Sequence, residues 1–149
     1  AKLETLPCLT AAIREALRMG YGTTSRFIRV APEVTMQYKN YVFPPRTAIS
    51  MSAMLLCQHP DVFEDLHTFN PERWLGKNQP ADVYVFGRGS RMCAGQNLAY
   101  TELYLALATI VRRFTLNLFE TDYSDIEAVC DAVFPMPKAD TKGVRVLVL

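Results

Sequence analysis

Cys93 has the most distinctive chemistry in this chain, because it stands in a glycine-rich segment directly before the longest stretch of helical apolar spacing. The first turn of a helix favours an anion, so it would stabilise the thiolate, which is the metal-binding form of cysteine. Gly89 and Gly95 would let the backbone approach a flat ligand and point amide hydrogens at the sulfur. Arg91 could pair with a carboxylate on the same ligand. The residue types alone favour a structural cysteine buried in a turn.

Two charged motifs accompany the cysteine segment. Glu15 and Arg18 are three residues apart, which places both side chains on one face of a helix. Taken alone, such a pair is an exposed ion pair worth a few tenths of a kcal/mol. Arg73 stands in the motif Phe69-Asn70-Pro71-Glu72-Arg73-Trp74, within a segment that has no sustained periodicity.

The spacing Phe-x-x-Gly-x-Arg-x-Cys-x-Gly over residues 86–95 resembles the haem-binding signature of the cytochrome P-450 family, with every fixed position filled. Glu15-x-x-Arg18 resembles the Glu-x-x-Arg signature of that family, and residues 69–74 resemble its Pro-Glu-Arg-Trp element. The three motifs follow the family's order, and the similarity covers essentially all 149 residues. The run of sequence looks most like fungal microsomal members that oxidise secondary metabolites.

The resemblance implies that the chain binds haem b, with Cys93 as the axial thiolate ligand of the iron. It implies that Arg91 contacts a haem propionate and that Phe86 packs near the thiolate face of the ring. Gly89 and Gly95 would admit the backbone beside the ring.

Further residues receive roles from the same resemblance. Arg29 would be a second propionate contact, although a solvent-facing strand arginine is the alternative. Glu15, Arg18 and Arg73 would form a buried charge network that locks the irregular segment under the haem. The residues expected to face the substrate are Gly22, Thr23, Thr24 and Phe27, together with the segment 133–135.

Periodicity and turn residues predict the elements that would position these side chains. Helices are expected over residues 6–19 and 96–114, the second deeply packed, with a helical turn at 54–58. Strands are expected at 27–30, at 34–43 as a hairpin turning at Lys39-Asn40, and at 47–53, 115–119 and 144–149. Residues 61–79 are expected to be irregular, and an acidic loop with a turn at 135–137 separates the last two strands. The expected fold is mainly α with small β-sheets.

Composition narrows the classes of function. The chain has 16 basic and 15 acidic residues, a net charge of +1 and no basic stripe, so a nucleic-acid partner is not expected. Its apolar runs are far shorter than the roughly 18 residues that span a bilayer. Cys8, Cys57 and Cys130 are widely spaced and match neither a zinc pair nor a disulfide framework, so we interpret them as thiols in a reducing compartment.

Family members are roughly three times as long as this chain, and the three motifs belong to their carboxyl-terminal third. The resemblance therefore implies that residues 1–149 are the carboxyl-terminal part of a single cytochrome P-450 domain that lacks its amino-terminal two-thirds. The membrane anchor would lie in that missing part, as would the helix bearing the distal acid and threonine. No catalytic residue is therefore assigned here. The complete protein would lie on the cytoplasmic face of the endoplasmic reticulum membrane.

The activity implied for the complete protein is that of a haem-thiolate monooxygenase. It would take electrons from an NADPH-dependent reductase and insert one oxygen atom from O2 into a small apolar organic substrate. The fragment alone is expected to be inactive. Two alternatives stay open at this stage, an inactive truncated remnant and a P-450-like isomerase or dehydratase that does not activate O2.

Overall fold

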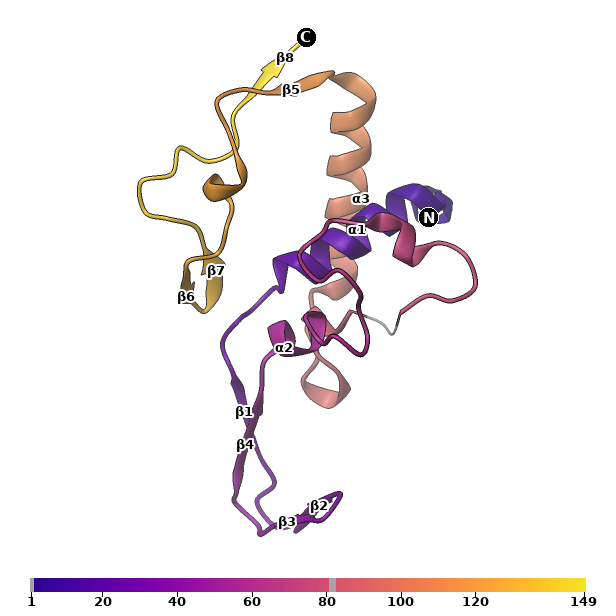
Figure 1. The fold of residues 1–149 in the computed structure, drawn as a ribbon. Coiled ribbons are helices and arrows are strands. Elements are labelled where there is room, and N and C mark those ends of the chain that lie inside the picture. Colours follow the sequence, from indigo (N-terminus) through magenta and orange to yellow (C-terminus); the bar gives the residue numbers. More distant parts are fainter. Residues whose placement is uncertain (1, 81–82) are drawn as a thin grey trace.

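The structure is a computed structural model that describes residues 2–80 and 83–149. Two helices form its centre, α1 (Pro7–Gly20) and the longer α3 (Gln96–Arg113), which cross one another (Figure 1). The hydroxyl groups of Thr10 and Tyr104 join the two helices across a distance of 2.9 Å. Both helices agree with their predicted ranges to within a residue.

Helix α1 begins with Pro7, whose fixed φ suits a first helical turn and whose missing N–H is not needed there. It ends at Tyr21, which adopts a left-handed conformation and donates its N–H to the carbonyl of Leu17 at 3.1 Å. The buried face holds Ile13, as the apolar spacing predicts, but it also carries two charged residues. This helix therefore brings charge into the interior.

The expectation that α3 is deeply packed was wrong. Among the described residues of this helix only Tyr104 is buried, while Leu105, Ile110 and Val111 are exposed. The elements with the most extensive packing on α3 are α1 and the short helical turn Leu3–Thr5, which cover only part of its circumference. Apolar spacing shows which face seeks burial, but it does not show whether the chain supplies a cover for that face.

Two antiparallel strand pairs form the extension at the bottom of Figure 1. Strand β1 (Phe27–Val30) pairs with β4 (Ala48–Met51), and β2 (Met36–Tyr38) pairs with β3 (Tyr41–Phe43). The second pair turns at Lys39, which has φ +52°. The predicted strands and the predicted turn are both confirmed.

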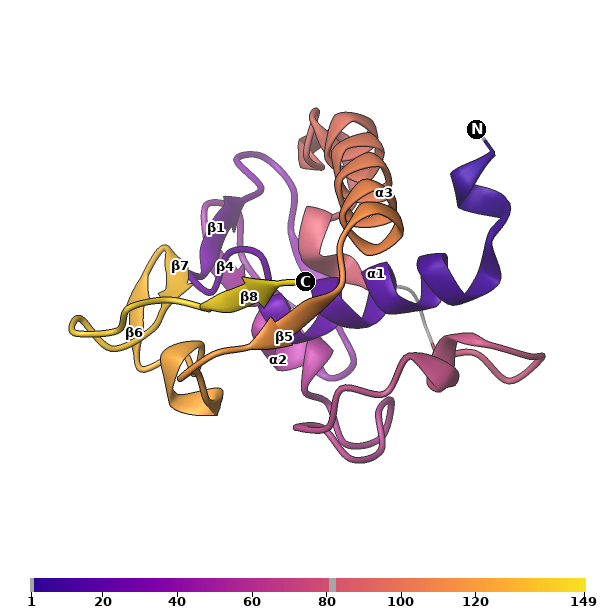
Figure 2. The ribbon, with the colours of Figure 1, turned by 90° about the horizontal axis from the view of Figure 1, so that it is seen from above.

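Two further pairs lie at the carboxyl-terminal end. Strand β5 (Leu116–Leu118) pairs with β8 (Val146–Val148), and the views in Figures 1 and 2 show them side by side. Strand β6 (Cys130–Ala132) pairs with β7 (Phe134–Met136), so the prediction of only a loop and a turn here was wrong. Pro135 favoured the prediction of a turn, because proline disfavours strands. In a two-stranded hairpin, however, each strand has a free edge that needs no amide donor.

Residues 61–79 are irregular, as expected. The described part of the segment between β4 and α3 contains the short helix α2 (Ala53–Cys57) and single helical turns at Pro71–Trp74 (η2), Tyr84–Phe86 (η3) and Gly89–Arg91 (η4). A small core forms where this segment packs on α1, made of Ala11, Cys57, Phe63, Trp74 and Val83. Burial raises the pKa of the Cys57 thiol to about 11, which keeps this cysteine protonated and apolar at neutral pH. In the part of the chain that the structure describes, no helix is long and apolar enough to cross a membrane.

Two neighbouring glycines give a matched test of this packing. Gly22 has φ +61°, and a Cβ there would lie 3.3 Å from the carbonyl oxygen of Val85, whereas a Cβ on Gly20 would meet nothing within 4 Å. We expect Gly22→Ala to lower the free energy of unfolding by about 1–2 kcal/mol, and Gly20→Ala, at the end of a helix, to raise it by up to about 1 kcal/mol. Denaturation midpoints of the complete polypeptide measure both changes. Equal effects of the two substitutions would contradict the prediction.

Candidate functional site

The carboxylate of Glu15 lies at the centre of a buried polar cluster. Glu15 and Arg18 are both fully buried, one helical turn apart on α1. Arg18 binds the carboxylate through two hydrogen bonds, from Nη2 to Oε1 at 2.8 Å and from Nε to Oε2 at 3.0 Å. This two-pronged geometry is the strongest that an arginine can form with a carboxylate. The pair is therefore not the exposed ion pair that its spacing alone suggests.

The same carboxylate receives three donors from η2 and the residue before it. Arg73 donates from Nε to Oε1 at 3.1 Å, and the backbone N–H of Asn70 donates to the same oxygen at 3.1 Å. Trp74 donates its indole N–H to Oε2 at 2.8 Å. The structure thus brings Glu15, Arg18 and Arg73 together and adds two donors. Sequence reasoning missed these two, although a buried tryptophan needs a partner for its N–H.

The Nη1 groups of both arginines hold the irregular segment by its carbonyl groups. Arg18 donates from Nη1 to the carbonyl oxygens of Leu66 at 3.0 Å and Cys57 at 3.2 Å. Arg73 donates from Nη1 to the carbonyl oxygen of Glu64 at 3.0 Å. Two cations face one anion here, so these carbonyl dipoles supply negative potential that one carboxylate cannot. The path of residues 57–68 is therefore set by the arginines of the cluster.

The ionisation of Glu15 follows from these contacts. Burial by itself raises the pKa of a carboxyl group, because the charged form loses its hydration. The hydrogen bonds from Arg18, the Asn70 amide and the Trp74 indole, together with the charge of Arg18, outweigh burial and hold the pKa of Glu15 below its ordinary value. The carboxylate is therefore ionised at neutral pH.

The cysteine loop follows this cluster and leads into α3. The N–H of Cys93 donates to the carbonyl oxygen of Phe86 at 2.8 Å, which closes the loop, and the thiol side is exposed. Gly89 has φ +77°, a backbone conformation that disfavours side chains, so its glycine is required by the turn. The Phe86 ring packs on Tyr100 with 5.3 Å between centroids. That contact anchors the loop to the first turns of α3, at the lower end of the helix in Figure 1.

The surroundings of Cys93 fit a flat ligand that brings its own carboxylates. A Cβ on Gly95 would lie 3.8 Å from the Cys93 sulfur, and a Cβ on Gly89 would meet nothing within 4 Å. Arg91 is exposed in η4, and across residues 2–80 and 83–149 the structure shows no carboxylate paired with it. An open thiol with an unpaired cation nearby suits haem, which offers iron and two propionates.

Arg29, the second residue expected to contact a propionate, contacts its neighbours on β1 through its side chain. It lies on β1, where its guanidinium donates to the carbonyl oxygen of neighbouring Ile28 at 3.1 Å and lies 5.9 Å from the centroid of the Phe27 ring. It too has no carboxylate partner in the described ranges. The structure records no contact that joins this strand residue to the Cys93 loop.

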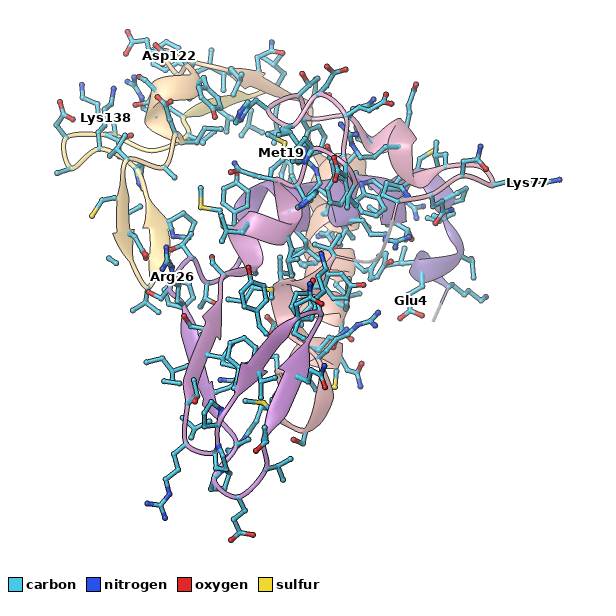
Figure 3. The ribbon with its side chains drawn as sticks, turned by 60° about the horizontal axis from the view of Figure 1, so that its bottom comes forward. Glu4, Met19, Arg26, Lys77, Asp122 and Lys138 are labelled. Atoms are coloured by element: carbon cyan, nitrogen blue, oxygen red, sulfur yellow. The ribbon has the colours of Figure 1, made fainter. Side chains whose placement is uncertain are left out.

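Two of the residues expected to face the substrate, Gly22 and Thr24, contact η3 and the β6–β7 hairpin. Gly22 packs against Val85 in η3, directly before the cysteine loop. Thr24 donates its N–H to the carbonyl oxygen of Val133 at 3.0 Å, which joins the two segments expected to face the substrate. Thr23 is half-buried and Phe27 is exposed. Figure 3 labels Arg26, which lies beside the same hairpin.

A shallow cavity of about 240 Å³ opens where these segments meet. Its lining comes from the end of α1, from α2 and from the β6–β7 hairpin, and comprises Tyr21, Thr24, Met54, Val129, Cys130 and Pro135 among others.

Comparisons with known proteins identify the family of the chain. The family model described as Cytochrome P450 matches residues 1–142. The chain is 43% identical to "Cytochrome P450 monooxygenase sdnE" of Sordaria araneosa over 96% of this chain and 29% of that protein. It is 41% identical to "Tryptophan 6-hydroxylase fscE" of Fusarium equiseti, over 99% of this chain and 30% of the relative. The chain therefore spans about 30% of the length of these relatives.

Solved structures show the same fold. The retinoic acid-bound cyanobacterial CYP120A1 superimposes with a TM-score of 0.78 at 26% identity, covering 99% of this chain and 34% of that one. A zebra fish cytochrome P450 determined with abiraterone gives the same TM-score at 25% identity, covering 97% of this chain and 34% of that one. The fold of this chain is therefore that of the matching part of a cytochrome P450. The chain belongs to the cytochrome P450 family.

The lowered pKa of Glu15 gives a pH-dependent prediction. The folded chain holds Glu15 ionised while the unfolded chain protonates it near its ordinary value of 4.5. Its contribution to stability is therefore complete above that value and is lost as the pH falls through the lower folded-state pKa. We expect Glu15→Gln to lower the free energy of unfolding at neutral pH by about 3–5 kcal/mol, because both arginines lose their anion. The variant should also show a shallower loss of stability in acid.

Denaturation of the complete polypeptide between about pH 3 and pH 7 measures this difference. Glu33→Gln is the matched control, because Glu33 is exposed on the loop between β1 and β2. Parallel pH curves for Glu15→Gln and the unsubstituted protein would contradict the assignment.

Proposed function

We propose that this chain is the carboxyl-terminal third of a haem-thiolate monooxygenase and supplies the proximal half of its haem site. The observation that carries the proposal is the open Cys93 thiol in a loop closed onto the Phe86 carbonyl directly before α3. Exposure alone does not set Cys93 apart, since Cys8 and Cys130 are exposed too; the closed loop directly before α3 does. The likeness of nearly the whole chain to fungal monooxygenases supports the same conclusion.

In this proposal each residue of the loop has a physical task. Cys93 holds the iron through its sulfur, and the α3 N-terminus favours the thiolate charge. Arg91 and, from strand β1, Arg29 are the cations available for the propionates. The Phe86 carbonyl holds the Cys93 N–H, and Gly95, whose added Cβ would lie 3.8 Å from the sulfur, leaves room beside it. The bound haem would supply oxygen chemistry, with electrons from an NADPH-dependent reductase and O2 as the oxygen donor.

The charge cluster around Glu15 has a positioning role in the proposed enzyme. It holds the irregular segment through carbonyl groups that no regular element satisfies. That segment packs with Val83, ten residues before the cysteine ligand, in the same small core. The cluster thereby fixes where the cysteine loop begins.

The substrate class is inferred from the names of the relatives. Two relatives are named a tryptophan 6-hydroxylase and, at 40% identity, the "Fusicoccadiene C-8 hydroxylase" of Phomopsis amygdali. Both names describe hydroxylation of an organic molecule. We propose a small, largely apolar secondary metabolite as substrate, and a complete protein anchored at the endoplasmic reticulum membrane by a segment outside this chain.

The ligand role of Cys93 is tested in the complete polypeptide. We expect the reduced, carbon monoxide-bound protein to give a thiolate-type Soret band, and Cys93→Ser to abolish it because a hydroxyl does not replace the thiolate. Cys130→Ser is the matched control, since Cys130 is also exposed and free. Retention of the band in Cys93→Ser would disprove the assignment.

The isolated chain of 149 residues is expected to hold haem weakly and to show no turnover. Large apolar side chains of α3 and of the strands are exposed, and a haem bound at Cys93 would lack a cover on its other face. Titration of the isolated chain with haem, beside an apolar-surface dye, measures both properties. A stable thiolate-type spectrum from the isolated chain would show that this third builds the site unaided.

A further inference from the structure

The tip of the β6–β7 hairpin is a single strained residue. Ala132 pairs with Phe134, so Val133 alone makes the turn, with φ +77°. A β-branched residue with positive φ is a conformational outlier, and a one-residue turn of this kind is rare in proteins. Such a conformation persists only where the surroundings impose it. The neighbouring side chains must therefore hold Val133 in this conformation.

The carboxylate of Asp131 supplies much of that restraint. Its Oδ1 accepts the N–H of Val133 at 3.0 Å, which fixes the turn from within the hairpin. The same oxygen accepts the hydroxyl of Thr24 at 2.6 Å and that of Ser25 at 3.4 Å. One carboxylate oxygen therefore binds the turn and the segment after α1 at the same time.

Thr24 completes the connection and is itself held from the other side. Its N–H donates to the carbonyl oxygen of Val133 at 3.0 Å, so the two segments are joined by backbone as well as side chain. Its own carbonyl accepts the hydroxyl of Ser52 at 2.7 Å. Ser52 is buried at the N-cap of α2 and makes no side-chain cap there. Its hydroxyl is committed to Thr24 instead, so the connection rests on the core.

We propose that Asp131 is a positioning residue that clasps the hairpin tip to residues 22–25 and thereby sets the shape of the substrate space. The inference rests on the proposed function, in which both segments face the substrate. The clasp holds Val133 in its strained conformation and fixes its distance from Thr24. Loss of the clasp would let the tip relax away, because the strain favours release.

The test uses the complete, haem-loaded polypeptide with Asp131→Ala, Asp131→Asn and the control Asp140→Ala, which changes an exposed aspartate outside the hairpin. Amide hydrogen exchange is followed in peptides covering residues 22–27 and 130–136. Imidazole and clotrimazole are the spectral probes, since both ligate haem iron but only clotrimazole is large enough to touch the walls. Asp131→Asn keeps an oxygen acceptor in the same place.

We expect Asp131→Ala to speed amide exchange in both peptides about tenfold. It should weaken clotrimazole binding about fivefold and leave imidazole binding unchanged. Asp131→Asn should retain most of the slow exchange and most of the clotrimazole affinity. Asp140→Ala should change neither property. Faster exchange without a change in the clotrimazole-to-imidazole ratio would overturn the positioning role and leave a structural one. Unchanged exchange would overturn the clasp itself. Loss of all haem spectra in the unsubstituted protein would instead refute the proposed function, and the exchange measurement would still decide the clasp.

Discussion

The structure depends on one buried carboxylate that binds two arginines. Glu15 has no exposure to water and accepts five hydrogen bonds, two from Arg18 and one each from Arg73, Trp74 and the Asn70 amide. Burying two cations with one anion costs more in lost hydration than the ion pairs alone return. The arrangement holds because carbonyl groups of residues 57–68 also face the guanidinium groups. The cluster is thus a device for specifying geometry more than a source of net stability.

The geometry it specifies is that of a segment with little regular hydrogen bonding. Residues 58–70 contain no helix or strand, so their backbone carbonyls need partners from elsewhere. Arg18 and Arg73 provide those partners at fixed distances from α1. Trp74 joins the polar cluster to the apolar core, since its indole N–H reaches Glu15 while its ring packs against Phe63 at 5.8 Å between centroids. Polar and apolar contacts therefore fix the same stretch of chain.

Sequence patterns predicted most of the elements because those elements are decided locally. Pro7 and the glycines after Met19 bound the first helix, and the Lys39-Asn40 turn defines a hairpin. The β6–β7 hairpin was missed because its turn is one residue long and held by Asp131 and Thr24, which no local pattern indicates. The packing of α3 was overestimated because periodicity reports an apolar face and not its cover. Both failures depend on how residues distant in the sequence pack, which local patterns do not report.

In the candidate site too, local motifs were predictable from the sequence and contacts between distant residues were not. Motif spacing singled out Cys93, Glu15 and Arg73, but not the donors Trp74 and Asn70 that complete the carboxylate's shell. Trp74 shares a core with Val83, and Val85, two residues further on, packs against that core and against Gly22. The chain then needs only one closed turn, from the Phe86 carbonyl to the Cys93 N–H, to present the thiol. The position of the sulfur therefore depends on the Glu15 cluster through short, packed steps, so a change at this buried carboxylate would alter the position of a cysteine in a separate loop.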